Sequence, residues 1–185
     1  MTAPAPSPYP DSAAARDRWI LGRRPARNQL DPWRPYAFLV EREAGRAGGP
    51  AVDVATIFLT NRECPWRCVM CDLWRNTLED ATPAGAIPAQ IQYALERMPG
   101  LAPERSELKL YNAGSLFDRR AVPPEGDEAI AQLASPFRRT IVECHPTLVG
   151  RRCLEFQERL GRPLEVAMGL ETAHPEVLER LNKRM

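Results

Sequence analysis

The stretch that decides the fold is residues 54–71, which read VATIFLTNRECPWRCVMC. Residues 54–60 are apolar, rich in β-branched side chains and too few for a helix, and this pattern predicts a buried strand. Three cysteines, Cys64, Cys68 and Cys71, follow within one short loop. Thiolates are the soft ligands that iron–sulfur clusters and zinc prefer. The sequence therefore predicts a metal-binding loop directly after a buried strand.

Three thiolates rather than four have a chemical consequence. A cubane cluster held by three cysteines has one iron without a protein ligand, and that iron can bind a small molecule, as at the open position of a catalytic metal site. Two other interpretations stay open: a zinc-binding structural or interaction module with His145 as fourth ligand, and three unconnected thiols. Zinc sites usually contain two C-x-x-C-like pairs, and the sequence holds no second pair.

Length and composition limit the function classes. The chain has 185 residues, of which 44% are hydrophobic and 26% charged, and this is enough for one sizeable core. A formal net charge of +1 gives nucleic-acid binding no support from overall charge. No apolar run approaches the roughly 20 residues that span a bilayer, so we expect no membrane contact. Five cysteines with three clustered do not suggest a disulfide framework, and this favours a reducing cytoplasm.

The sequence predicts two parts. Residues 1–35 form a proline-rich leader and a short helix, with Ser12 as N-cap and Gly22 beyond its end. Residues 36–185 form the second part, which opens with a strand over 36–40, a glycine-rich turn and the return strand that leads to the cysteines. We expect these two strands to form an antiparallel hairpin.

After the cysteine loop, a unit of strand, loop and helix repeats. The predicted strands cover residues 108–111, 140–144 and 164–168, and the apolar helix faces lie within residues 87–98, 123–133, 149–160 and 175–181. This alternation predicts an α/β fold with a parallel sheet and right-handed crossovers. Four βα units do not close a barrel, and residues 182–185 show neither a helix stop nor a following element. We therefore expect the N-terminal part of a longer protein; a small complete α/β sandwich is the alternative.

Polar segments follow each predicted strand, where functional residues collect in parallel α/β folds. They are the cysteine loop and residues 112–115, 143–145 and 171–172. In the third segment, one of Glu143, Cys144 and His145 could act on a substrate. Cysteine often serves as a small core residue, which favours a structural role for Cys144, and we expect Cys153 in the core. His174 is expected to be a capping or loop residue.

The spacing C-x-x-x-C-x-x-C resembles the cluster-binding signature of the radical S-adenosylmethionine (SAM) superfamily. The resemblance implies a partial (βα)6 TIM-like barrel, of which this chain carries the four N-terminal units. It also implies a [4Fe–4S] cluster held by Cys64, Cys68 and Cys71, whose open iron is chelated by the amino and carboxylate groups of SAM. One electron from an external donor of the flavodoxin or ferredoxin type then cleaves SAM to methionine and a 5′-deoxyadenosyl radical, which abstracts hydrogen from substrate.

The resemblance also implies which residues contact SAM, with departures from the family pattern. The expected contacts are Met70, Asn112, Gly114, Ser115 and Glu171. Members usually carry a Gly-Gly-Glu-like segment where this chain has residues 112–115, so backbone carbonyls and Ser115 would replace the acidic acceptor. Met70 stands where an aromatic residue usually packs on adenine, and Glu171 would accept hydrogen bonds from the ribose. Trp66 and Trp74 would exclude water from the cluster.

Further phrases, at residues 56–63, 72–74 and 109–118, resemble one branch of the superfamily. That branch includes the elongator catalytic subunit, the tRNA methylthiotransferases and, closest, the radical SAM subunit of archaeosine synthase. The resemblance spans about residues 53–185 and implies a modified base in tRNA as substrate. A missing C-terminal part or a partner subunit would supply the tRNA contacts. An electron-transfer iron–sulfur protein is a third function class, disfavoured because such clusters normally have four protein ligands.

Overall fold

A five-stranded, mostly parallel sheet is the centre of the computed structural model, which describes residues 9–185. The strand order is β1-β2-β5-β6-β7. The antiparallel pair consists of β1 (Ala37–Glu43) and β2 (Val52–Leu59), separated by a short 3-10 turn, η1 (Arg46–Gly48). The strands that run parallel to β2 are β5 (Glu107–Asn112), β6 (Arg139–Glu143) and β7 (Leu164–Ala167). The predicted α/β class, hairpin and parallel sheet are confirmed. The predicted leader lies mostly outside the described residues.

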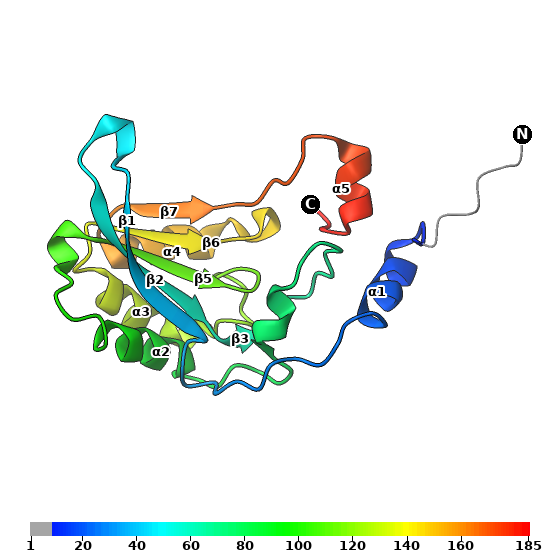
Figure 1. Cartoon of the computed structure of the whole chain (residues 1–185), viewed down its shortest axis with the longest axis horizontal. Coiled ribbons are helices and arrows are strands. Elements are labelled where there is room, and N and C mark those ends of the chain that lie inside the picture. Colours follow the sequence, from blue (N-terminus) through cyan, green and yellow to red (C-terminus); the bar gives the residue numbers. More distant parts are fainter. Residues whose placement is uncertain (1–8) are drawn as a thin grey trace, which may run out of the picture. The chain divides into compact units, whose positions relative to one another are not determined.

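Three helices cover one face of this sheet (Figure 1). They are α2 (Ala86–Leu95), α3 (Asp127–Ala134) and α4 (Arg151–Leu160). The side chains that point from β2 and β5 towards the helices are fully buried. They are Ala55, Ile57 and Leu59 of β2 and Leu108 and Leu110 of β5. Both β1 and β7 are edge strands, so the sheet over the described part of the chain is open and not a closed barrel.

Helix α4 shows how the sequence sets the helix ends. Cys153, Phe156 and Leu160 form its buried stripe, and Gly161 ends it with φ 60°, a left-handed conformation that glycine adopts without strain. Val149 was expected on the same stripe, and this is wrong. It precedes the first helical residue and is 47% exposed, because Gly150 is extended and the helix begins only at residue 151.

The chain forms two compact units, and each unit is built from segments that are not consecutive in the sequence. The larger unit consists of residues 27–64 and 73–169 and contains the sheet. It also holds a two-stranded parallel ladder of β3 (Asn61–Arg62) and β4 (Thr77–Leu78), and the 3-10 turns η2 (Leu73–Asn76), η3 (Pro103–Arg105), η4 (Pro124–Gly126) and η5 (Pro146–Leu148).

The smaller unit consists of residues 9–26, 65–72 and 170–185 of the described chain. It contains α1 (Ala13–Leu21), which Ser12 caps as predicted by accepting a hydrogen bond from the Ala15 amide at 3.3 Å. It also contains α5 (Pro175–Leu181), which begins at a proline, as expected for a first helical position. The fourth predicted βα unit is therefore divided, with strand β7 in the larger unit and helix α5 in the smaller.

The expectation that no helix stop follows residue 181 is wrong. Asn182 ends α5 in the left-handed conformation, with φ 59°, and its amide donates to the Glu179 carbonyl at 3.1 Å. Asparagine is the residue other than glycine that most readily takes this position. Among residues 9–185, no helix combines the length and apolar character needed to cross a membrane.

We predict that Arg152→Met destabilises the larger unit by about 3–5 kcal/mol. Arg152 on α4 makes two hydrogen bonds, of 2.8 and 2.6 Å, to the carboxylate of Asp127 on α3, whose side chain is only 7% exposed. Without Arg152, the buried negative charge of Asp127 lacks the hydrogen bonds and the nearby positive charge that offset its loss of hydration. Urea unfolding measures the loss. Arg105→Met is the control, because its ion pair with Glu104 is exposed; equal losses in the two variants would refute the assignment.

Candidate metal centre

The three predicted metal ligands lie in the connection between β3 and η2. Cys64 belongs to the larger unit, whereas Cys68 and Cys71 belong to the smaller. None of the five cysteines is in a disulfide, and the three in this loop are half-buried. Within residues 9–185, no three or more His, Cys, Asp or Glu side chains come close enough together to hold one metal ion. The ligand set of Cys64, Cys68 and Cys71 thus stays a prediction from the sequence.

Within the larger unit, Cys64 packs directly against Gly114. Strands β2 and β5 are parallel neighbours with Leu59 opposite Asn112, so the segments that follow both strands leave the sheet side by side. Gly114 has φ 117°, and a Cβ atom there would lie 2.5 Å from the Cβ atom of Cys64. Only glycine permits this backbone conformation and this approach. Cys64, which is expected to hold the cluster, is therefore in contact with Gly114, which is expected to contact SAM.

The Asn112 side chain is buried at the end of β5 without a hydrogen-bond partner. It is 1% exposed, and neither its amide nitrogen nor its carbonyl oxygen is paired. The adjacent Asn61 donates to the Ala113 carbonyl at 3.4 Å, but its own side-chain oxygen is likewise unpaired. Buried polar groups are almost always hydrogen-bonded in proteins. These buried side-chain amides lie at the carboxyl edge of the sheet, where their atoms could hydrogen-bond to a polar ligand.

The hydroxyl of Ser115 is used inside the protein. Ser115 is fully buried, donates to the Sγ atom of Cys144 at 3.3 Å and accepts from the Phe117 amide at 3.1 Å. These bonds hold the turn that follows β5 against the end of β6. In this structure, Ser115 shapes the segment that contains Asn112 and Gly114.

The other two loop cysteines have a local framework in the smaller unit. The Cys71 amide donates to the Cys68 carbonyl at 3.2 Å, and the Val69 amide donates to the Leu181 carbonyl at the end of α5 at 3.0 Å. Burial, followed by the nearby thiol of Cys71, raises the pKa of Cys68 to about 11. The metal-free thiol is therefore protonated at neutral pH, and binding a metal there releases its proton.

The remaining predicted SAM contacts, Met70 and Glu171, are also in the smaller unit. Met70 is 46% exposed. Glu171 has a positive φ of 67°, and its carboxylate accepts a hydrogen bond of 2.7 Å from Lys183. A contact with ribose would have to share this carboxylate with Lys183. His174 precedes α5 at the N-cap position, without a side-chain capping bond.

The segment after β6 is mainly structural. Cys144 is 3% exposed, and burial raises the pKa of its thiol to about 11. His145 is buried, and its Nδ1 atom accepts from the Thr147 amide at 3.3 Å, which caps η5. Cys153 lies in the core of α4, as expected. Glu143 is half-buried. Burial raises the pKa of Tyr111 on the neighbouring strand β5, and the negative charge of Glu143 contributes to the same shift.

The two tryptophans near the cysteines belong to different units. Trp74 is 6% exposed in η2 of the larger unit, with the guanidinium groups of Arg27 and Arg75 at 5.9 and 5.7 Å from its ring. Trp66 is half-buried in the smaller unit. Their predicted role of excluding water from a cluster stays a prediction.

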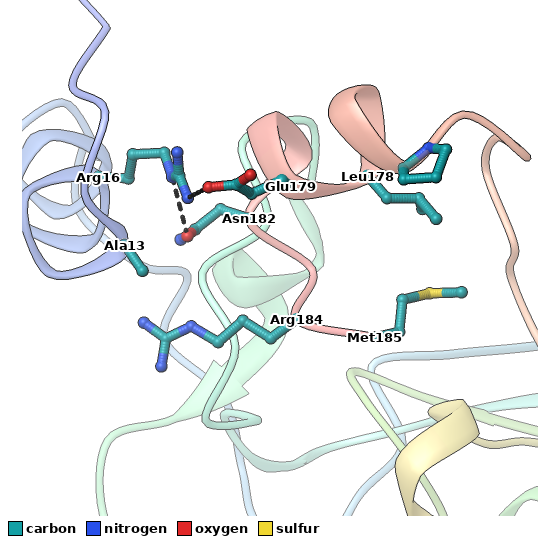
Figure 2. A pocket seen from close by; sticks show the side chains of 8 residues that line it. Ala13, Arg16, Leu178, Glu179, Asn182, Arg184 and Met185 are labelled. Carbon is teal, nitrogen blue, oxygen red and sulfur yellow. Dashed lines mark hydrogen bonds and ion pairs between the residues drawn. The ribbon is translucent and has the colours of Figure 1, made fainter.

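Sequence reasoning missed a polar network in the smaller unit. Arg16 is buried on α1, and its guanidinium points at Glu179 and Asn182 on the wall of a cavity of about 500 Å³ (Figure 2). It donates to these side chains at 3.3 and 3.4 Å. Asn182 in turn donates to the Arg67 carbonyl in the cysteine loop at 2.9 Å. The sequence carries no signal for this network, because its contacts join residues that are far apart in the chain.

We predict that Cys144 resists alkylation by iodoacetamide in the native chain at pH 8, whereas Cys71 reacts. The thiolate is the nucleophile, and the raised pKa of Cys144 leaves the thiol protonated until the pH approaches about 11. Peptide mass spectrometry reads each site, and in urea all five cysteines should react. Equal labelling of Cys144 and Cys71 in the native chain at pH 8 would contradict the structure.

We also predict that Gly114→Ala destabilises the chain more than Gly100→Ala does. Both glycines have positive φ, of 117° and 80°, but an added Cβ meets nothing within 4 Å at Gly100 and collides with Cys64 at Gly114. Strain alone costs about 1 kcal/mol at Gly100, and strain plus collision about 2–4 kcal/mol at Gly114. Urea unfolding of the two variants tests this, and equal losses would show that the close approach is absent.

Comparison with known proteins gives one distant relative. The chain is 26% identical over 139 residues to the uncharacterized protein MJ0550 of the archaeon Methanocaldococcus jannaschii. The alignment covers 69% of this chain but only 38% of the archaeal protein, so the chain spans about two fifths of that relative's length. No family model matches the sequence, and no solved structure matches it.

Proposed function

We propose that this chain is the cluster-binding part of a radical SAM enzyme. In this proposal, Cys64, Cys68 and Cys71 hold a [4Fe–4S] cluster, and SAM binds the iron that lacks a protein ligand. The observation that carries the proposal is the C-x-x-x-C-x-x-C spacing directly after a buried parallel strand. The contact between Cys64 and Gly114 supports it, because it joins the first ligand to the segment expected to bind SAM.

The residues at the sheet edge fit a bound amino acid moiety. The unpaired carboxamide of Asn112 offers both a donor and an acceptor, which suits a group carrying an amine and a carboxylate. With glycine at position 114, the backbone leaves no side chain between this segment and Cys64. These features compensate for the absence of an acidic residue from residues 112–115.

The sheet topology is compatible with the partial barrel that the proposal includes. Strands β2, β5, β6 and β7 are adjacent in sequence order, and each crossover helix between them lies on the same face of the sheet. A doubly wound sheet would reverse its strand order and place helices on both faces. We infer that these four strands are the first part of a (βα)6 barrel.

When bound, the cluster supplies one electron that cleaves SAM to a carbon-centred radical. The three thiolates hold it, Asn112 and the backbone at Gly114 orient the amino acid part of SAM, and Met70 packs against its adenine. Glu171, released from Lys183 or sharing it, accepts from the ribose hydroxyls. Trp66 and Trp74 keep water away from the metal.

We extend the proposal to partners and substrate. A flavodoxin- or ferredoxin-type protein supplies the electron in a reducing cytoplasm, which five cysteines without a disulfide support. The substrate is a modified base in tRNA, supported by the resemblance across residues 53–185. The tRNA contacts come from another part of the protein or from a partner subunit, since this chain carries a net charge of only +1.

Anaerobic reconstitution with iron and sulfide tests the proposal. We expect a brown, oxygen-labile protein with about four irons per chain, whose electron paramagnetic resonance signal changes when SAM is added. Cys71→Ser should lose the cluster, whereas Cys153→Ser, which alters a core cysteine outside the loop, should keep it. A colourless chain that binds one zinc would replace the proposal with a zinc module. A cluster indifferent to SAM would indicate electron transfer.

A further inference from the structure

The side chain of Arg27 joins the two ends of the cysteine loop. Its side chain is 22% exposed, and its guanidinium donates to the carboxylate of Glu63, the residue immediately before Cys64. It also donates to the carbonyl of Trp74 at 2.8 Å and to the hydroxyl of Thr77, both beyond Cys71. Arg27 and these three partners all belong to the larger unit, so the joined ends lie in the same compact unit.

The same ends are held by backbone pairing. Strands β3 and β4 pair in parallel, with Asn61 opposite Thr77 and Arg62 opposite Leu78. The backbone amide of Asn28, the residue next to Arg27, donates to the Arg75 carbonyl at 3.0 Å. A two-residue parallel ladder is weak alone, because each strand contributes few hydrogen bonds. The side chain of Arg27 adds the contacts that the ladder lacks.

Electrostatics makes Arg27 difficult to replace. The Glu63 side chain is only 7% exposed, and a buried carboxylate requires a positive partner. The planar guanidinium offers five donors in a fixed fork, so one side chain satisfies a carboxylate, a carbonyl and a hydroxyl together. A lysine retains the charge but cannot reach all three acceptors from one point. Sequence reasoning did not single out Arg27, because a long-range polar contact has no periodicity.

We propose that Arg27 is a positioning residue for the metal centre: it closes the base of the cysteine loop and thereby limits the positions available to Cys64, Cys68 and Cys71. The role of Arg27 in cluster binding rests on the proposed function, whereas the closing of the loop rests on the contacts of Arg27 alone. A loop closed at its base loses less conformational freedom when three of its side chains bind one cluster.

The first test needs no metal. We expect hydrogen exchange at residues 61–64 and 73–78 of the metal-free chain to become about tenfold faster in Arg27→Met, with Arg27→Lys intermediate. Arg34→Met is the matched control, because its guanidinium side chain is 61% exposed and its ion pair with Asp31 is on the surface. Exchange in β5 and β6 should not change. The inference would be overturned if exchange became faster throughout the sheet, or if it did not become faster at the loop ends.

The second test reads the cluster. After reconstitution, Arg27→Met should lose iron to a chelator about tenfold faster than the wild-type chain, whereas Arg34→Met should match the wild type. The double variant Arg27→Met, Glu63→Gln also removes the buried negative charge of Glu63. It should therefore regain the urea midpoint without regaining iron retention, which separates positioning from folding. Wild-type retention in Arg27→Met would overturn the inference.

The two tests separate this inference from the proposed function. If the wild-type chain binds a SAM-responsive cluster and Arg27→Met retains it equally well, Arg27 has no positioning role and the proposed function stands. If the wild-type chain binds no cluster, the proposed function fails and the metal role of Arg27 fails with it. In that case the exchange measurement still decides whether Arg27 closes the loop.

Discussion

The close approach of Gly114 to Cys64 is the constraint on which the structure of the candidate site depends. It requires two neighbouring parallel strands, β2 and β5, that end at the same level of the sheet. It also requires a glycine with a backbone conformation that other residues rarely adopt, and a cysteine that follows the short strand β3. A parallel sheet with helices on one face provides the first of these requirements. The ends of these strands thus position the part of the candidate site formed by Cys64 and Gly114, and the cysteine loop supplies the thiols.

Most of the fold was predictable because burial leaves a periodic signal in the sequence. The apolar runs around Ile57, Leu110 and Val142 are too short for helices and are fully buried strands. The stop of α4 at Gly161 and the start of α5 at Pro175 were equally readable. In contrast, α2 ends at Leu95, before the expected stop at Gly100, and α3 begins at Asp127, after the expected prolines. The stop at Asn182 was missed, because asparagine takes the left-handed conformation less often than glycine and gives a weaker signal.

The division into two units and the contacts of Arg27 with both ends of the cysteine loop were not predictable, because both depend on residues far apart in the chain. The smaller unit joins three segments through polar contacts such as that of Asn182 with Arg67. Such contacts follow no period and have no characteristic spacing. Within the candidate site, the cysteine spacing predicted a set of metal ligands, but the unpaired amide of Asn112 became evident only when its burial was known.

The central claim is that three cysteines leave one iron of a cubane cluster open to SAM. Mössbauer spectroscopy of the chain reconstituted with iron-57 tests it most directly, because an iron bound by nitrogen and oxygen differs in isomer shift from one bound by sulfur alone. The account predicts that adding SAM changes one iron in four and leaves the other three as they were. Four irons that all ignore SAM, or a chain that takes up no iron, would contradict it.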